Sequence, residues 1–270
     1  MPNPDSSGNA RVRLSLATMR AVFPHAPDSI VYAFVERQGV LTAAGLNQTR
    51  QRLAYCFANL HAETGGFTIR NLTENINYTA ARMAAVWPNR FASAAEVQNR
   101  YGTAPGWQTK AFDDIYGNRM GNRPGTSDGS TYIGRGGPQI TGRDGYAEIG
   151  KRIGVDLVAA PERACDAGLQ PDIAAAFWDW KGMNRYADAA DFIGCVKAWN
   201  GGTNGLAERK AQLARILPVL QKAEWGMIPD APARPPPDPA PPPRPVTQPP
   251  ARAAFFMAAL SALARLLRRA

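Results

Sequence analysis

The chain has 270 residues, of which 45% are hydrophobic and 20% are charged, so it can bury a sizeable core and has the composition of a soluble enzyme. Its formal net charge is +9 at pH 7, which favours polyanionic partners such as nucleic acid, anionic membranes or bacterial wall polymers. No helix-turn-helix pattern, zinc-finger spacing or RNP-like aromatic motif accompanies this charge. We therefore expect no nucleic-acid partner.

Composition divides the chain into three segments. Periodic runs of Ala, Leu and Arg over residues 1–228 predict one all-α globular domain. About half of residues 229–250 are proline, which neither continues a helix nor pairs in a sheet, so this segment is predicted to be an extended linker. Residues 251–270 are predicted to form a short basic amphipathic helix.

The first 24 residues contain no uninterrupted apolar stretch that could form the core of a secretory signal. We therefore expect synthesis in the cytoplasm without a signal peptide. The three cysteines are too few and too scattered for a disulfide framework, and their spacing matches no metal site. No metal and no cofactor is expected.

Residues 47–64 have the pattern of an amphipathic helix. Asn47 is available as an N-cap, and Gly65 and Gly66 follow the segment where a left-handed stop is expected. The apolar positions recur at i, i+3, i+4 and i+7, and they are Leu53, Cys56, Phe57 and Leu60. The segment is therefore predicted to be a helix with one buried face.

Glu63 falls in the last turn of this predicted helix, where the helix dipole is negative. The dipole and partial burial beside Phe67 both disfavour the ionised form, so we expect a raised pKa for Glu63. A raised pKa suits a general acid. A glutamate near a helix end is otherwise most often a solvated surface group.

Glu74 lies in a polar stretch, whose flanking residues are Asn71, Thr73, Asn75, Asn77 and Tyr78. Their amides and hydroxyls can hydrogen-bond a carboxylate and hold a water, so we expect Glu74 to stay ionised. Two carboxyl groups with different pKa values are what hydrolysis of a glycosidic bond requires. An Asn-rich run is otherwise usually a loop, so these two glutamates leave both interpretations open.

Four motifs occur in order along the chain: "HAETGGF" with "ENINYTAARM", then "YGNRMGN", then "GRGGPQITGRDGY", and finally "AWNGGTNGLAERK". With these motifs, residues 45–220 resemble the bacterial and phage branch of glycoside hydrolase family 19. That group contains chitinases and endolysins with a lysozyme-like α-helical fold.

The resemblance implies that Glu63 is the proton donor and Glu74 the base that activates water. The family inverts the anomeric centre by single displacement, so the two carboxyl groups are expected to stand about 6.5–9.5 Å apart. His61 and Tyr78 are implied as supporting residues of the substrate site. The mechanism requires no metal.

Further positions match substrate-binding residues of the family. Gln139 and Thr141 correspond to residues that bind sugar and help to hold the nucleophilic water. Asn200 and Arg209 correspond to a polar pair at the cleft floor, where Arg209 is expected to orient Glu63 or Glu74. The chain departs from the family pattern at Asp144 and Gly145, so part of the sugar-binding floor is expected to differ.

The C-terminal segment has an apolar core, residues 253–264, that is shorter than the roughly 20 residues needed to span a bilayer. One face of the predicted helix is apolar and the other basic. The apolar face is Phe256, Leu260, Leu263 and Leu267, and the basic face is Arg265, Arg268 and Arg269. This pattern favours contact with an anionic membrane surface, and docking to a partner or no function are the alternatives.

Three functions are compatible with these features. Cleavage of β-1,4 bonds in peptidoglycan, at the cell wall or in the periplasm, is favoured by the basic charge and the arginine-rich tail. A chitinase of the same mechanism is the closest alternative, because both polymers contain N-acetylglucosamine. A wall-binding or membrane-binding module without hydrolysis is disfavoured because both glutamates are present.

Overall fold

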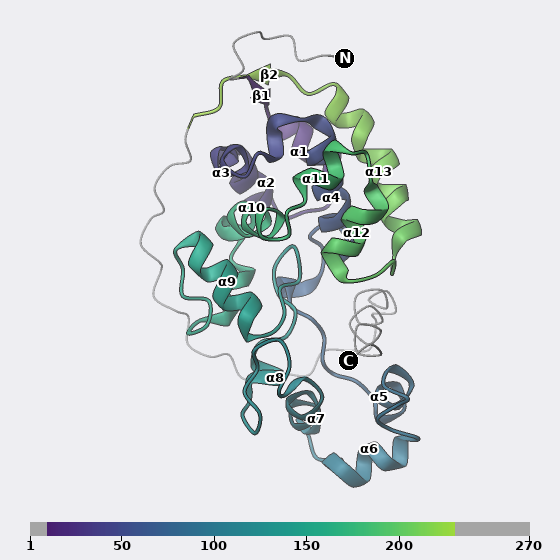
Figure 1. Ribbon diagram of the computed structural model, residues 1–270. Coiled ribbons are helices and arrows are strands. Elements are labelled where there is room, and N and C mark those ends of the chain that lie inside the picture. The colour runs from purple at the N-terminus through teal and green to yellow at the C-terminus, as the bar shows by residue number, and fades with distance from the viewer. Residues whose placement is uncertain (1–9, 230–270) are drawn as a thin grey trace.

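The computed structural model describes residues 10–229, and this part of the chain is mainly helical (Figure 1). The first helices are α1 (Leu16–Val22), α2 (Asp28–Glu36), α3 (Gln38–Ala43), α4 (Arg50–Thr64), α5 (Ala80–Val86), α6 (Ala94–Tyr101) and α7 (Trp107–Tyr116). They are followed by α8 (Asp128–Thr131), α9 (Arg143–Ile153), α10 (Gln170–Trp180), α11 (Asn184–Asp188), α12 (Phe192–Asn200) and α13 (Leu206–Gln221). The predicted linker beyond Pro229 and the predicted amphipathic helix lie outside the described residues.

The larger of two hydrophobic cores is built from the helices before residue 65 and after residue 142. Helix α4 lies within it, packed along α13, with α10, α11 and α12 also in contact (Figure 1). Trp178 is completely buried in this core, and its indole nitrogen donates to Asn184 Oδ1 at 2.7 Å. A buried indole N–H needs such an acceptor.

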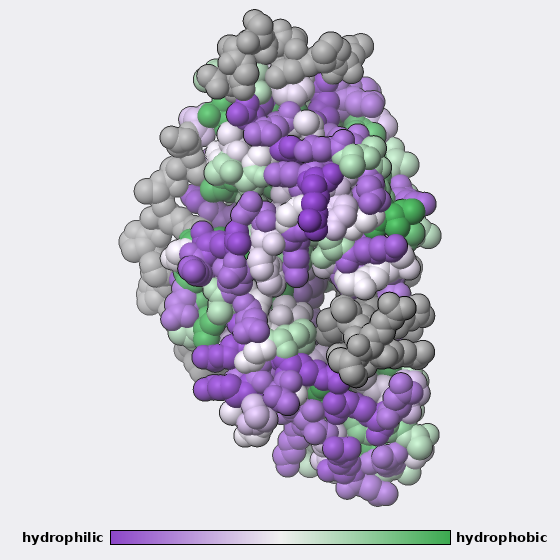
Figure 2. All heavy atoms as spheres, in the orientation of Figure 1, coloured by the Kyte–Doolittle hydropathy of each residue, from purple (hydrophilic) through white to green (hydrophobic). Residues whose placement is uncertain are grey.

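The smaller core lies among α5, α6, α7 and α8, at the lower end of the molecule in Figure 1. Its buried members are Ala80, Met83, Trp87, Phe91, Val97, Ala111, Phe112, Ile115, Tyr116 and Ile133. Figure 2 shows that hydrophilic residues cover most of the face in view, with hydrophobic residues only in small groups. The apolar side chains of both helix groups are therefore turned inward.

The two cores are joined by a short extended segment that carries Glu74. Leu72 belongs to the larger core, whereas Ile76 and Tyr78 pack against the smaller one. Bridges link Thr73 to Arg135 and Arg135 to Ile140, so this segment pairs with the glycine-rich loop after α8. Glu74 thus lies at the junction of the cores.

Short strands supplement the helices. β1 (Arg11–Val12) pairs antiparallel with β2 (Trp225–Gly226), which ties the two ends of the described chain together. The sequence predicted a helical domain, and the described residues confirm that it is mainly helical. Among residues 10–229, no helix combines the length and apolar character needed to cross a membrane.

Helix α4 is confirmed with one correction at its start. All four predicted apolar positions are completely buried, and Gly65 ends the helix with a φ of 59°. The predicted N-cap is wrong: Thr49 caps the helix by accepting from the Arg52 N–H at 3.0 Å. Asn47 lies instead in a 3-10 turn (Leu46–Gln48), buried, with its amide donating to Thr42 Oγ1 at 2.9 Å.

Candidate active site

One face of α4 carries polar side chains into the larger core. Tyr55, Asn59 and Glu63 are spaced at i, i+4 and i+8, so they lie one above another on the same face of the helix. Asn59 is completely buried, and only 4% of Glu63 is exposed. Buried polar groups at these positions require hydrogen-bond partners.

Arg209 of α13 supplies those partners. Its Nη2 donates to Glu63 Oε1 at 2.5 Å, and its Nη1 donates to Asn59 Oδ1 at 2.7 Å. Only 1% of Arg209 is exposed, so the Arg209–Glu63 ion pair is fully buried. The structure thus resolves the choice left open by the sequence, because Arg209 contacts Glu63.

Glu74 is held by the backbone of the glycine-rich loop. Its Oε2 accepts from the Gly134 N–H at 3.0 Å, and its own N–H donates to the Gly134 carbonyl at 2.8 Å. Its Oε1 is inaccessible to solvent and has no hydrogen-bond partner among the described residues. One carboxylate oxygen is therefore fixed by the backbone, and the other is enclosed without a hydrogen-bond partner among the described residues.

The predicted environment of Glu74 is corrected by the structure. Burial raises the pKa of Glu74, and the Gly134 N–H and the charge of Arg135 oppose this rise without cancelling it. The neighbouring polar side chains make no hydrogen bond to it: Thr73 Oγ1 bonds the Asn71 carbonyl, and Asn75 Oδ1 bonds the Asn77 N–H. Neighbours in sequence alternate in direction along an extended segment, so they point away from the carboxylate.

The glycine-rich loop bridges the surroundings of the two glutamates. A Cβ at Gly134 would stand 2.9 Å from Gln139 Oε1 and 3.3 Å from Glu74 Oε2. A Cβ at Gly137 would stand 2.9 Å from Leu60 and 3.2 Å from Phe67, on the two sides of the α4 terminus. Glycine at these positions permits the loop to pass between Glu74 and the end of α4.

Gln139 and Thr141 brace this loop. Gln139 adopts a left-handed φ of 56°, and its Nε2 donates to the Gly136 carbonyl at 2.8 Å and to the Leu72 carbonyl at 3.2 Å. Thr141 Oγ1 donates to the Gln139 carbonyl at 3.0 Å. A left-handed backbone at a residue with a side chain carries strain that the surrounding bonds must offset. Both predicted residues thus lie beside the Glu74 segment.

Tyr78 lies near Glu74 and packs its ring on the smaller core. Its ring centroid is 5.7 Å from that of Trp87 and 5.9 Å from that of Phe112. Burial first, and then the charge of Glu74, raise the pKa of Tyr78. Burial also raises the pKa values of Tyr116 and Tyr146; the charge of Glu74 is the next cause at Tyr116, whereas at Tyr146 it is minor and Arg135 opposes the rise. Of these three residues only Tyr78, which the sequence had identified, is not fully buried, and the Tyr146 hydroxyl donates to the Ile133 carbonyl at 2.6 Å.

His61 and Asn200 are not joined to either glutamate by a hydrogen bond. The His61 ring stacks on Phe23 with centroids 6.0 Å apart, and burial together with the charge of Arg215 lowers the pKa of His61 to about 4. Asn200 closes the loop after α12, where its Oδ1 accepts from the Gly202 N–H at 3.0 Å and its Nδ2 donates to the Asn204 carbonyl at 3.1 Å. The role of Asn200 at the cleft floor stays a prediction.

The family departures at Asp144 and Gly145 fall in the first turn of α9. Asp144 is exposed, and its backbone N–H donates to the Met120 carbonyl at 3.0 Å. Gly121, with a φ of 75°, leaves the space that the Asp144 carboxylate occupies. Asp144 therefore packs on the "YGNRMGN" loop, and an altered sugar-binding floor stays a prediction.

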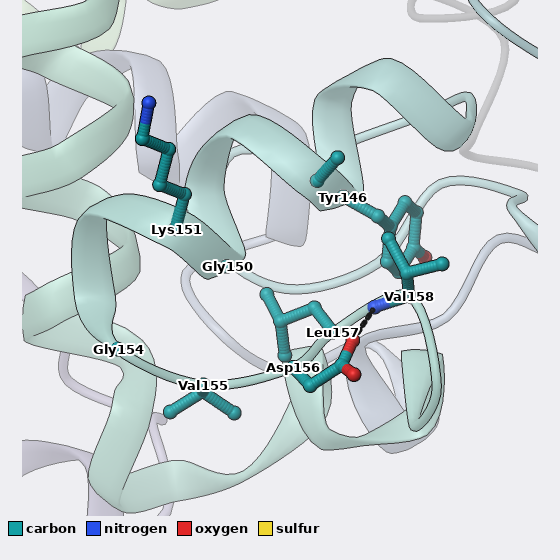
Figure 3. A pocket seen from close by; sticks show the side chains of 9 residues that line it. Tyr146, Gly150, Lys151, Gly154, Val155, Asp156, Leu157 and Val158 are labelled. Carbon is teal, nitrogen blue, oxygen red and sulfur yellow. Dashed lines mark hydrogen bonds between the residues drawn. The ribbon is translucent and has the colours of Figure 1, made fainter.

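A cavity of about 400 Å³ lies elsewhere, at the end of α9 and in the loop that follows (Figure 3). Its wall includes Val155, Leu157 and Val158. Asp156 Oδ1 accepts a hydrogen bond from the Val158 N–H at 3.1 Å. Neither Glu63 nor Glu74 lines it. The described residues also contain no group of three or more His, Cys, Asp or Glu side chains able to hold a metal ion.

The sequence did not predict two contacts around the glutamates, and only one of them corresponds to a recognisable sequence pattern. Asn59 lies one helical turn before Glu63, so the i, i+4 spacing of two polar residues on an apolar face could have indicated it. The Gly134 N–H that holds Glu74 is 60 residues away in sequence and belongs to the backbone. No side-chain pattern reports such a donor.

No protein-family model matches the chain. A Haemophilus influenzae protein described as a glycosyl hydrolase family 19 domain-containing protein is 32% identical over 207 residues, which are 76% of this chain and 96% of that protein. A crystal structure of a chitinase C mutant superposes with a TM-score of 0.51 at 18% identity and covers 77% of each chain.

Chitinase C from Streptomyces griseus HUT6037 has a TM-score of 0.49 and 15% identity, covering 82% of this chain and 97% of the other. The mutant chitinase structure shows that the helical fold is shared. The resemblance found in the four motifs is confirmed by the Haemophilus influenzae relative, which spans nearly its whole length in the match. The chain belongs to glycoside hydrolase family 19.

Proposed function

We propose that this protein is an inverting glycoside hydrolase that cleaves β-1,4 bonds of peptidoglycan, with Glu63 as general acid and Glu74 as general base. One observation carries the proposal. Each of two carboxyl groups has one oxygen held inside the protein, Glu63 by Arg209 and Glu74 by the Gly134 N–H. The remaining oxygens make no hydrogen bond to the described residues.

Glu74 is suited to deprotonate the attacking water. The Gly134 N–H fixes Oε2, so Oε1 can accept the proton as the water oxygen bonds to the anomeric carbon. A base whose pKa is raised toward the working pH accepts a proton more readily, and burial raises the pKa of Glu74 in that direction. The Tyr78 phenol can donate a hydrogen bond to water or sugar, because its raised pKa keeps it protonated.

Glu63 is suited to protonate the departing glycosidic oxygen. Arg209 holds one carboxyl oxygen in a fixed position, and Glu63 lies in the last turn of α4, which Gly65 ends. Proton transfer to the leaving oxygen occurs as its bond to the anomeric carbon breaks, and inversion follows because water attacks the opposite face.

Peptidoglycan is favoured over chitin by charge. The chain carries +9 formal charges, and +5 remain on residues 1–228 when the six arginines and two aspartates beyond Ile228 are removed. Peptidoglycan carries acidic stem peptides, and chitin is uncharged, so a basic enzyme gains attraction only to the former. Chitin hydrolysis by the same residues is the second candidate, and one similar protein of known structure is named a chitinase.

The test compares turbidity loss of purified peptidoglycan with release of products from chitin oligomers, using the full chain and the chain ending at Ile228. We expect faster hydrolysis of peptidoglycan by both. A higher kcat/KM on chitin oligomers would favour the chitinase. No turnover of either polymer would favour a binding module without hydrolysis. Action at the cell wall and contact of residues 251–270 with an anionic membrane belong to the same proposal.

A further inference from the structure

We infer that Asn59 is a positioning residue for the general acid, acting on Glu63 through Arg209. The inference rests on the proposed role of Glu63. Asn59 is absent from the residues that the family resemblance implied, and it is completely buried, so it does not reach the substrate. Its effect must pass through the side chains that it contacts.

The amide of Asn59 is oriented by two opposing contacts. Its Nδ2 donates to the Tyr55 carbonyl at 2.8 Å, one turn earlier in α4. Its Oδ1 accepts from Arg209 Nη1 at 2.7 Å. Rotation of the amide by 180° would set an NH₂ group against the guanidinium and a carbonyl oxygen against the Tyr55 carbonyl, so only one orientation satisfies both neighbours.

The guanidinium of Arg209 is in turn fixed by the two α4 side chains together. Nη1 bonds Asn59 and Nη2 bonds Glu63, while its Nε is buried and has no hydrogen-bond partner among the described residues. A planar guanidinium held firmly at two nitrogens cannot rotate about its long axis. Without the Asn59 amide, Arg209 retains its bond to Glu63 and only a long contact, 3.5 Å, from Nη1 to the Asn59 backbone carbonyl. The Asn59 contact is thus what sets the plane in which the Glu63 oxygen is held.

This arrangement predicts a specific kinetic effect. Proton donation by Glu63 is realised in the transition state, so misplacement of its carboxyl group lowers kcat and leaves ground-state sugar binding unchanged. Misplacement by about 1 Å at a reacting group costs about 100-fold in rate. We expect loss of the Asn59 contact to reduce kcat by about 10–100-fold and to change KM by less than about twofold.

Two substitutions separate the contacts of Asn59. Asn59→Ser retains a hydroxyl that can bond the carbonyl four residues earlier, as helical serine does, but is too short to reach Arg209. Asn59→Asp retains the oxygen that accepts from Arg209 and loses the donor to Tyr55. The inference predicts a large loss of kcat in the serine variant and a smaller loss in the aspartate variant. If Asn59→Ser does not fold, Asn59→Thr replaces it, because the threonine hydroxyl can also bond the carbonyl four residues earlier and is also too short to reach Arg209.

Asn47→Ser is the matched control. Asn47 is likewise completely buried and its amide donates to Thr42 Oγ1 at 2.9 Å, but it makes no hydrogen bond to either glutamate or to Arg209. We expect it to lower the melting temperature in the same way as Asn59→Ser and to leave kcat unchanged.

The assay measures kcat and KM on peptidoglycan with the full chain, beside thermal unfolding of each variant. Wild-type kcat in Asn59→Ser, a KM change without a kcat change, or an equal kcat loss in Asn47→Ser would each overturn the inference. Failure of the wild-type protein to hydrolyse either polymer would refute the proposed function instead. The two failures are therefore distinguishable.

Discussion

Replacement of Arg209 by methionine tests the buried ion pair most directly. The change removes the bonds to Glu63 and Asn59 and leaves the Glu63 carboxylate, 4% exposed, without a cation. Breaking a buried pair by removal of one partner costs about 3–5 kcal/mol, because the remaining charge stays desolvated. For a domain of this size that corresponds to a fall in melting temperature of about 6–20 °C.

The control is an ion pair on the surface. Arg100 and Asp114 approach to 2.9 Å, but their side chains are 49% and 37% exposed, so solvent screens them. Arg100→Met is expected to cost less than about 1 kcal/mol. The double variant Glu63→Gln with Arg209→Met is expected to be more stable than Arg209→Met alone, because it buries no unpaired charge.

Urea unfolding at pH 7, followed by tryptophan fluorescence, measures each free energy of unfolding. A loss below about 1 kcal/mol for Arg209→Met would refute the reasoning, since it would equal that of an exposed pair. A double variant less stable than Arg209→Met would also contradict it. In that case the hydrogen bonds of Glu63, and not its charge, would carry the stabilisation.

Three further predictions concern the roles of the glutamates and the tail. Glu63→Gln should lose turnover of polysaccharide but retain hydrolysis of aryl glycosides whose leaving group needs no protonation, whereas Glu74→Gln should lose both. The opposite pattern would exchange the two roles. NMR should find the inverted anomer in the wild-type reaction. Burial raises the folded-state pKa of Glu74 above its unfolded value, so the wild-type protein loses stability as the pH rises through that pKa. Glu74→Gln should therefore be more stable than wild type at pH 7 and should lose this advantage below about pH 4, as urea titrations at several pH values would detect. Truncation after Ile228 should leave peptidoglycan hydrolysis nearly unchanged and weaken binding to anionic vesicles, most clearly at low salt; equal vesicle binding by both forms would count against a membrane role.

Local patterns predicted α4 well because its buried face and its stop are encoded within one segment. Leu53 and Leu60 are buried as their spacing required, and Gly65 is left-handed as its position after the helix required. The predicted N-cap was wrong because two suitable residues, Asn47 and Thr49, lie two positions apart. Asn47 is buried and its amide donates to Thr42 instead. Propensity alone does not distinguish Asn47 from Thr49.

The environment of the glutamates could not be predicted because it depends on distant parts of the chain. The polar residues around Glu74 suggested an ionised carboxylate, but its real contacts are the Gly134 backbone and the junction of two cores. Likewise the family resemblance identified Arg209 without stating which glutamate it holds. The packing of α13 along α4 decides that question.

The pairing of distant segments also determines when the site can exist. The Glu74–Gly134 bond spans 60 residues and the Glu63–Arg209 bond spans 146. Contacts that close such long loops form late, because the chain entropy must be lost before the contact stabilises anything. A nascent chain that has not yet reached residue 209 presents Glu63 without its cation. We therefore expect competence for hydrolysis only in chains that extend past Arg209.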